Sequence, residues 1–271
     1  MSDENKPLND KDKKRLEEGR GKGTGENYVP FIKVGEFSGS GESIRVKSRV
    51  AKRIHHFHSG IELSAFIVFD WHSKTSDIRE QFPIPLNDSL SIAKELGIRH
   101  PQIRGELSIV TTDLFVDFFC GQNLAIAVKS SSDLNKKRIV EKLQIEKAYW
   151  EQKGYDWRIF TEKDISDTIK ENIAWLRSAM SLDDNASETF EYADLVNFLD
   201  RISNYKTVAL TKLCGRLDDL YELEPGFHIS LMRYGIAHRI FLVSLSTPYY
   251  ALISEDLKLN PNRYQEQAYV S

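Results

Sequence analysis

The 271-residue sequence predicts an α/β domain with a mixed sheet, followed by a mainly α, winged-helix-like domain. Strand and helix patterns alternate between residues 43 and 161, an order that favours one mixed α/β domain. From residue 162 helical periodicity dominates, and residues 239–253 have the pattern of a strand pair that follows the last helix. We therefore expect a first domain over residues 1–161 and a second over residues 162–271.

Local patterns also predict the individual elements. In the first domain these are a short charged helix over 9–20, a hairpin over 43–58, a helix over 59–71, a short helix over 88–96, a hairpin over 111–129, an amphipathic helix over 135–153 and a strand over 157–161. In the second domain they are helices over 162–176, 190–202 and 206–222, and one that begins near Phe227.

Composition excludes some classes of protein. The longest apolar run, residues 63–69, is far shorter than the roughly 20 residues of a membrane span. The charged first residues lack the apolar core of a signal peptide, so we expect a cytoplasmic protein with no membrane partner. The two cysteines, Cys120 and Cys214, form no zinc or disulfide pattern and are expected to be reduced thiols.

Charge is unevenly distributed along the chain. Residues 1–58 carry 13 Lys and Arg against 9 Asp and Glu, whereas residues 181–271 carry 8 against 13. A basic beginning and an acidic end are compatible with DNA at one end and a protein partner at the other. Chance variation in solvated surfaces is the alternative.

Asp113 and Lys129 lie at equal distances from Gly121, on two apolar arms rich in Val, Ile, Phe and Leu. If the hairpin folds at Gly121, Asp113 stands directly opposite Lys129 and shares a face with it. An acid and a lysine on adjacent strands are the layout of a metal-dependent nuclease site. A purely structural cross-strand ion pair, worth under about 1 kcal/mol when exposed, is the alternative.

Hydrolysis of a phosphodiester needs an activated water and stabilised oxyanions, which carboxylate-bound Mg²⁺ or Mn²⁺ can supply. Asp113 offers one oxygen ligand and the Val128 carbonyl another, while Ala125 and Ala127 would leave space on the Lys129 face. These residues predict a divalent metal site at the open end of the hairpin.

Glu62 is the best second carboxylate ligand in the sequence. Ser59-x-x-Glu62 also fits a helix capping box, and the two roles are compatible because a helix start can aim a carboxylate into a site. Asp117 is a weaker candidate, since an acid near an edge or loop needs no catalytic role.

Cations flank these residues and predict a DNA-binding surface. Arg45, Lys47 and Arg49 alternate and would share one face of a strand. With them we group Lys52, Lys136 and Lys137. A solvated charged face is the alternative. The glycine-rich basic loop over 18–25 lacks the spacing of a phosphate-binding P-loop, and the histidines at 55, 56 and 58 lack metal-ligand spacing.

Taken together, several motifs resemble the TnsA family, the endonuclease subunit of heteromeric cut-and-paste DNA transposases, over residues 18–175. They are Glu18-Gly-Arg-Gly-Lys-Gly-x-Gly-x-x-Tyr28-x-Pro30-Phe31, His55-His56-x-x-Ser59-x-x-Glu62-Leu63, Asp77-Ile-Arg-Glu-Gln-Phe-Pro83, His100-Pro-x-Ile-Arg104-Gly105, Thr112-Asp113-x-x-Val116-Asp117, Ala125-Ile-x-Val128-Lys129 and Glu141-Lys-Leu-x-x-Glu146-x-x-Tyr-Trp150.

The resemblance implies a restriction-endonuclease-like core and a C-terminal helix-turn-helix-like domain. It implies that Glu62, Asp113 and Lys129 form a Mg²⁺-dependent catalytic set that cuts the 5′ strand at transposon ends. It implies two partners, a TnsB-like transposase that acts on the 3′ strand and a TnsC-like AAA ATPase bound by the C-terminal domain. A bacterial, DNA-associated location follows from the same resemblance.

Two positions depart from the general nuclease formula Pro-Asp…(Asp/Glu)-x-Lys. Thr112 stands in place of the proline and Ala127 in place of the second acid, so Glu62 has to supply the missing ligand from a helix. Two other functions remain open on the sequence. One is a free-standing restriction or repair nuclease, and the other is a catalytically weak architectural subunit that binds DNA ends and recruits the ATPase.

Overall fold

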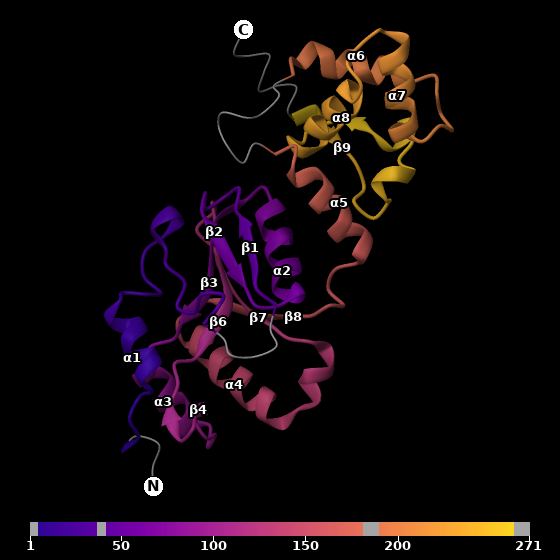
Figure 1. Cartoon of the computed structure of the whole chain (residues 1–271). Coiled ribbons are helices and arrows are strands. Elements are labelled where there is room, and N and C mark those ends of the chain that lie inside the picture. The colour runs from indigo at the N-terminus through magenta and orange to yellow at the C-terminus, as the bar shows by residue number, and fades with distance from the viewer. Residues whose placement is uncertain (1–4, 37–41, 181–189, 263–271) are drawn as a thin grey trace. The chain divides into compact units, whose positions relative to one another are not determined.

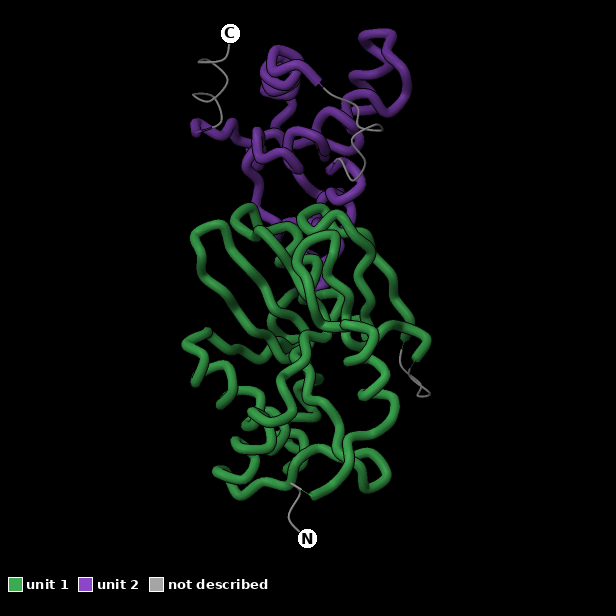
Figure 2. The backbone as a smooth tube through the Cα atoms, turned by 90° about the vertical axis from the view of Figure 1, so that its left-hand side faces the viewer, with its two compact units in different colours: residues 1–165 green, residues 166–271 purple. Residues whose placement is uncertain are grey.

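The computed structural model describes residues 5–36, 42–180 and 190–262 (Figure 1). The chain divides into two compact units, residues 1–165 and residues 166–271 (Figure 2), and each is described by itself. No helix within those described ranges is both long and apolar enough to cross a lipid bilayer.

A four-stranded mixed sheet forms the centre of the first unit, as the sequence predicts. Its strand order is β3-β6-β7-β8, with β7 and β8 parallel and the other neighbours antiparallel. The strands are β3 (Thr75–Pro83), β6 (Thr111–Phe118), β7 (Asn123–Val128) and β8 (Asp156–Phe160). Strand β3 is absent from the sequence-based expectation, whereas the 111–129 hairpin and the last strand are confirmed.

Helices cover both faces of this sheet (Figure 1). On one face Phe115 and Ala125 pack with residues of α3 (Leu86–Glu95) and α4 (Lys137–Gln152) in one buried cluster. Alternation along the strands turns their neighbours, the buried Leu114 and Ile126, to the other face. There lie α2 (Gly60–Trp71) and the β1–β2 hairpin of Ile44–Lys47 and Ile54–Phe57.

The register of the β6–β7 hairpin corrects one expectation. Asp117 pairs with Asn123 and Leu114 with Ile126, which places Asp113 opposite Ala127 and not opposite Lys129. The turn closes one residue earlier than Gly121, because the Gly121 N–H binds the Phe118 carbonyl and Gly121, at φ 82°, forms the last part of the turn. The observed partner of Asp113 differs from the expected one by two residues, an even number, so Asp113 and Lys129 still share a face of the sheet.

Shorter elements surround the sheet in the first unit. They are the helix α1 (Asp10–Glu17), the 3₁₀ turns η2 (Gly25–Asn27) and η3 (Ser131–Asn135), and the small hairpin of β4 (Gln102–Ile103) and β5 (Glu106–Leu107). The Asn9 side chain caps α1, and the Asp12 carboxylate accepts the Ile109 N–H at 2.8 Å. These contacts hold α1 against the chain that leads into β6.

A buried ionic cluster connects β3 to the β1–β2 hairpin. The Glu80 carboxylate is fully buried and accepts hydrogen bonds from the Arg53 guanidinium at 2.5 and 2.9 Å and from the His56 N–H at 3.0 Å. His55 Nδ1 lies 2.8 Å from the same carboxylate. His55 is therefore a buried core residue beside an acid.

The second unit is mainly helical, as expected. Its helices are α5 (Asp167–Arg177), α6 (Tyr192–Ile202), α7 (Leu210–Leu220) and α8 (Phe227–Ala237), followed by β9 (Phe241–Leu242), the 3₁₀ turns η4 (Tyr249–Ala251) and η5 (Ser254–Asp256), and β10 (Lys258–Leu259). The prediction of a strand pair within 239–253 is wrong, because β9 pairs with β10 and the 3₁₀ turns fill the interval. The winged-helix assignment stays a prediction.

Candidate active site

Asp113 and Lys129 meet at one end of the sheet, where β6 begins and β7 ends. The Asp113 Oδ2 atom accepts hydrogen bonds from Lys129 Nζ at 2.8 Å and from the Val128 N–H at 2.7 Å. Lys129 Nζ also donates to the Val128 carbonyl at 2.6 Å. The ammonium therefore lies between the two oxygens that the sequence analysis proposes as metal ligands.

The electrostatics of this pair favour the charged forms. Burial lowers the pKa of Lys129, but the negative charge and the hydrogen bond of Asp113 outweigh it and raise that pKa overall. The two side chains are 29 % and 14 % exposed, so solvent still reaches them. An ion pair in such a position can exchange its partners when a ligand enters.

Glu62 has the capping role that the sequence predicts, whereas its role as a ligand stays a prediction. The Ser59 hydroxyl accepts the Glu62 N–H at 3.2 Å and thereby caps α2, while the Glu62 carboxylate accepts from the Ser59 hydroxyl and the His58 N–H, each at 3.1 Å. Burial raises the pKa of Glu62 to about 7, and the charge of Asp113 adds to the effect. The helix start thus holds the carboxylate within electrostatic reach of Asp113 and Lys129.

Glu146 on α4 is a third carboxylate at this site, to which the sequence analysis assigns no role. Its side chain is 4 % exposed, and its Oε1 has no hydrogen-bond partner among the described residues. Burial raises its pKa to about 7; Asp113 raises it further and Lys129 opposes the rise. An acid on the inner face of a helix, between the buried Leu143 and Tyr149, is the signal that could have identified it.

Gln81 also reaches the site from β3. Its side-chain amide lies 3.4 Å from Asp113 Oδ1, and its backbone adopts a φ of 49°, which is uncommon for a residue other than glycine. Its amide oxygen accepts the Thr111 hydroxyl at 3.2 Å. Gln81 thus holds the second oxygen of Asp113 in place.

The site has the chemistry of a cation site, although no set of three or more His, Cys, Asp or Glu side chains within the described residues is grouped closely enough to hold a metal ion. Glu62 and Glu146 are buried acids whose pKa values both rise toward 7, and each rise includes a contribution from Asp113. A divalent cation would relieve this repulsion. Asp113 and the Val128 carbonyl offer it hard oxygen ligands of the kind that Mg²⁺ prefers.

Two residues at the site have structural roles. Thr112 is buried, and its hydroxyl accepts the Trp150 indole N–H at 2.7 Å, which ties β6 to α4. Asp117 forms a two-pronged ion pair with Arg79 at 2.6 and 2.8 Å and accepts from Asn123. Asp117 therefore points to β3, in agreement with its weaker rank as a ligand.

Ala125 and Ala127 do not leave open space beside Lys129. Both are fully buried, and Ala125 belongs to the apolar cluster with Trp150 and Phe115. The expectation fails because α4 packs directly on this face of the sheet. Any room for a ligand lies beyond the strand end, at Val128 and Lys129.

The predicted DNA-binding residues divide into two groups. Arg45 and Lys47 lie on β1, whereas Arg49 lies beyond the end of that strand and its guanidinium donates to the Asp70 carbonyl at 3.1 and 3.2 Å. Arg49 therefore does not share a strand face with the other two. Lys52 is exposed in the turn between β1 and β2.

Lys136 and Lys137, the other predicted DNA contacts, lie at the start of α4, which follows β7 by way of η3. Both are exposed, with Lys136 2.7 Å from Asp133 and Lys137 4.0 Å from Glu141. These exposed cations thus pair with half-buried carboxylates.

A mixed sheet with helices on both faces, and acids and a lysine at one end of it, has the arrangement of a nuclease core. Residues 72–162 match the family described as TnsA-like endonuclease N terminal, and residues 164–245 match TnsA endonuclease C terminal. The first match includes Asp113, Lys129 and Glu146, while Glu62 precedes it. The chain is a DNA endonuclease of the kind that serves as a transposase subunit.

It belongs to the TnsA family. Over 222 residues it is 38 % identical to the Escherichia coli protein "Transposon Tn7 transposition protein TnsA", a match that covers 81 % of this chain and 80 % of that relative. Enzymes of this kind work with a divalent metal, in agreement with the cation chemistry of the site.

Proposed function

We propose that the protein is a Mg²⁺- or Mn²⁺-dependent endonuclease that hydrolyses the 5′ strand at transposon ends during cut-and-paste transposition. In this proposal it acts with a TnsB-like transposase and a TnsC-like AAA ATPase. The observation that carries it is the Asp113–Lys129 ion pair at one end of the sheet, together with two buried carboxyl groups, Glu62 and Glu146, whose pKa values the Asp113 charge raises.

In the proposed mechanism Asp113 and the Val128 carbonyl would hold the metal, and Glu62 would be a further ligand. Bound there, the metal would polarise the phosphodiester and lower the pKa of a water. Lys129 leaves the Asp113 carboxylate and donates a hydrogen bond to the phosphate, where its positive charge stabilises the negative charge that develops in the transition state. Glu146, which is not one of these ligands and whose carboxyl pKa is about 7, can accept a proton at neutral pH.

We propose that DNA lies along the cations around this site, which are Arg45, Lys47, Lys52, Lys136 and Lys137. The acidic end of the chain, with 13 Asp and Glu against 8 Lys and Arg in residues 181–271, suits a protein partner better than DNA. We therefore assign catalysis to residues 1–161 and ATPase binding to residues 162–271.

Reconstitution tests this function against its alternatives. A labelled transposon-end duplex is incubated with Mg²⁺ and the purified chain, alone or with its TnsB-like partner. We expect 5′-strand cuts at the end only in the complete mixture. Efficient cutting of plasmid by the chain alone would favour a free-standing nuclease, and normal transposition by an Asp113→Ala protein would favour an architectural subunit.

The two raised carboxyl pKa values make metal binding and stability depend on pH. Because folding raises the pKa of Glu62 and Glu146 from 4.5 to about 7, their contribution to stability is complete below pH 4.5 and is lost as pH rises through 7. We expect the metal-free protein to melt at a lower temperature at pH 8 than at pH 6. Mg²⁺ should stabilise it more at pH 8, where it does not compete with protons.

Thermal melts at the two pH values, with and without Mg²⁺, check this expectation. The control is the double variant Glu62→Gln, Glu146→Gln, in which both the pH dependence and the effect of Mg²⁺ should shrink. An equal Mg²⁺ shift at pH 6 and pH 8 would contradict the assignment of these carboxylates.

A further inference from the structure

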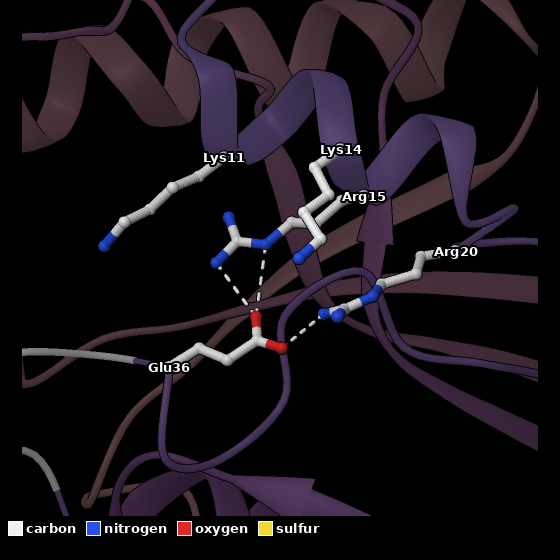
Figure 3. Close-up of a pocket in the computed structure, with 5 residues that line it drawn as sticks. All are labelled: Lys11, Lys14, Arg15, Arg20 and Glu36. Atoms are coloured by element: carbon white, nitrogen blue, oxygen red, sulfur yellow. Dashed lines mark hydrogen bonds and ion pairs between the residues drawn. The ribbon is translucent and has the colours of Figure 1, made fainter.

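A cationic pocket lies apart from the candidate active site, between α1 and the glycine-rich loop that follows it (Figure 3). It has a volume of about 290 Å³ and is lined by Lys11, Lys14, Arg15, Arg20 and Glu36. This glycine-rich basic loop lacks the spacing of a phosphate-binding P-loop. The candidate active site does not include it.

Two arginines hold one carboxylate at the centre of the pocket. Glu36 Oε2 accepts from Arg15 Nε and Nη2 at 3.2 and 3.0 Å, and Glu36 Oε1 accepts from Arg20 Nη1 at 2.5 Å. Figure 3 shows the carboxylate between the two guanidiniums, with the Lys14 side chain extending toward the same space and the Lys11 side chain directed to one side. Two planar forks around one anion are a geometry suited to phosphate as well as to carboxylate.

The surrounding fold fixes both arginines. The Arg15 guanidinium lies over the ring of the fully buried Phe31, 5.6 Å from its centroid, and also binds Asp12 at 2.7 Å. Arg20 is held by a loop that packs on β3: a Cβ added at Gly21, which has a φ of 76°, would lie 2.2 Å from Pro83 Cγ. Both arginine side chains are 12 % exposed. The pocket is therefore preorganised.

Positive charge exceeds negative charge in and around the pocket. Even when Asp12 and Glu18, which also contact the two arginines, are counted with Glu36, the cations outnumber the acids by four to three. Lys11 has no ion pair among the described residues, and Lys14 lies 4.0 Å from Glu18. Burial raises the pKa of Glu36, but the hydrogen bonds from Arg20 and Arg15 outweigh it and lower that pKa. The pocket thus stabilises a bound anion.

The pocket is within electrostatic range of the candidate active site. His58, whose backbone N–H binds Glu62, experiences the charges of Asp113, Glu36 and Arg15. We propose that the pocket binds a backbone phosphate of the DNA, and that Glu36 occupies the phosphate position until DNA displaces its carboxylate. The proposal rests on the proposed nuclease function.

Matched lysine variants test the phosphate site. The full chain carrying Lys11→Gln and Lys14→Gln is compared with one carrying Lys13→Gln and Lys147→Gln, two exposed lysines that are ion-paired to Asp10 and Glu151. Binding to an end duplex is measured in Ca²⁺ from 50 to 200 mM salt. The pocket variant should bind about tenfold more weakly, with a salt slope smaller by about 1, as expected for the loss of one phosphate contact. Equal behaviour of the two variants would overturn the proposal.

Glu36→Gln tests the displacement. It removes the competing negative charge and leaves an amide of the same shape, so DNA binding should become about tenfold tighter although the melting temperature falls. Unchanged or weaker binding would show that Glu36 is structural and would overturn its assigned role.

A duplex with single methylphosphonate substitutions locates the contact. One neutralised phosphate near the cut should weaken wild-type binding by about fivefold and leave the Lys11→Gln, Lys14→Gln variant unaffected. If no position behaves in this way, or if millimolar inorganic phosphate binds the pocket without competing with DNA, the pocket is not a DNA phosphate site. Asp113→Asn separates failure of the phosphate-site proposal from failure of the nuclease proposal. If the pocket variants behave like the controls but cutting still depends on Asp113, the nuclease proposal stands.

Discussion

Asp113→Asn is expected to reduce 5′-strand cleavage by about a thousandfold or more, the size of effect that removal of a central electrostatic group produces. The carboxylate binds Lys129 Nζ and the Val128 N–H, and its charge acts on Glu62 and Glu146. An amide of the same shape keeps the fold but loses the charge that attracts both the metal and the lysine. The measurement is single-turnover cutting in the reconstituted mixture.

Asp117→Asn is the matched control, because Asp117 lies on the same strand and face and forms its own ion pair, with Arg79. It should affect stability more than cutting. Lys129→Ala should resemble Asp113→Asn, and the double variant should be little worse than either alone, because residues that act as a unit are not additive. If Asp113→Asn cuts at a rate within tenfold of the wild-type rate, this site is excluded as the catalytic site.

Removal of the Asp113 charge should also change the pKa values of the neighbouring carboxyl groups. Since the Asp113 charge raises the pKa of Glu62 and of Glu146, its removal should lower both toward the ordinary value. The Asp113→Asn protein should therefore lose less stability between pH 6 and pH 8 than the wild type does.

Glu80→Ala is expected to have the largest effect on stability. It would leave Arg53 and His55 buried without their carboxylate, and breaking a buried pair in this way costs about 3–5 kcal/mol. Urea unfolding followed by tryptophan fluorescence measures the change. Glu151→Ala, which removes an exposed acid 3.6 Å from Lys147, is the control and should cost under about 1 kcal/mol. A similar small loss for Glu80→Ala would refute the role of the cluster.

The same cluster predicts the response to acid. Burial raises the pKa of Glu80, but His55 and Arg53 outweigh it and lower that pKa from 4.5 to about 2. Because the folded-state pKa is depressed, the contribution of Glu80 is present above pH 4.5 and is lost as pH falls from there through about 2. The stability of the wild type should therefore fall over this range of pH, and the stability of the Glu80→Gln protein should fall less steeply.

Local patterns were sufficient to predict the hairpin, the helices and the shared face of Asp113 and Lys129. The register was wrong, yet the face was right, because side chains on a strand alternate with a period of two. The capping signature at Ser59 and Glu62 was also readable, since a cap depends only on neighbours in the chain.

Features that depend on distant partners could not be predicted in this way. Strand β3 contains Asp77, Arg79 and Glu80, which read as solvent-exposed charges until Asp117 and Arg53 are brought beside them. Glu146 was missed for a similar reason, because a buried acid is recognisable only when the groups that it faces are known.

The ammonium of Lys129 fills the gap between Asp113 and the Val128 carbonyl. In the proposed mechanism, a cation that used these two oxygens would require the lysine side chain to move away from them first. Arrival of a phosphate gives the displaced ammonium a new acceptor and makes the exchange easier. Metal loading would then follow DNA engagement, which would limit cutting to DNA that the protein has already bound.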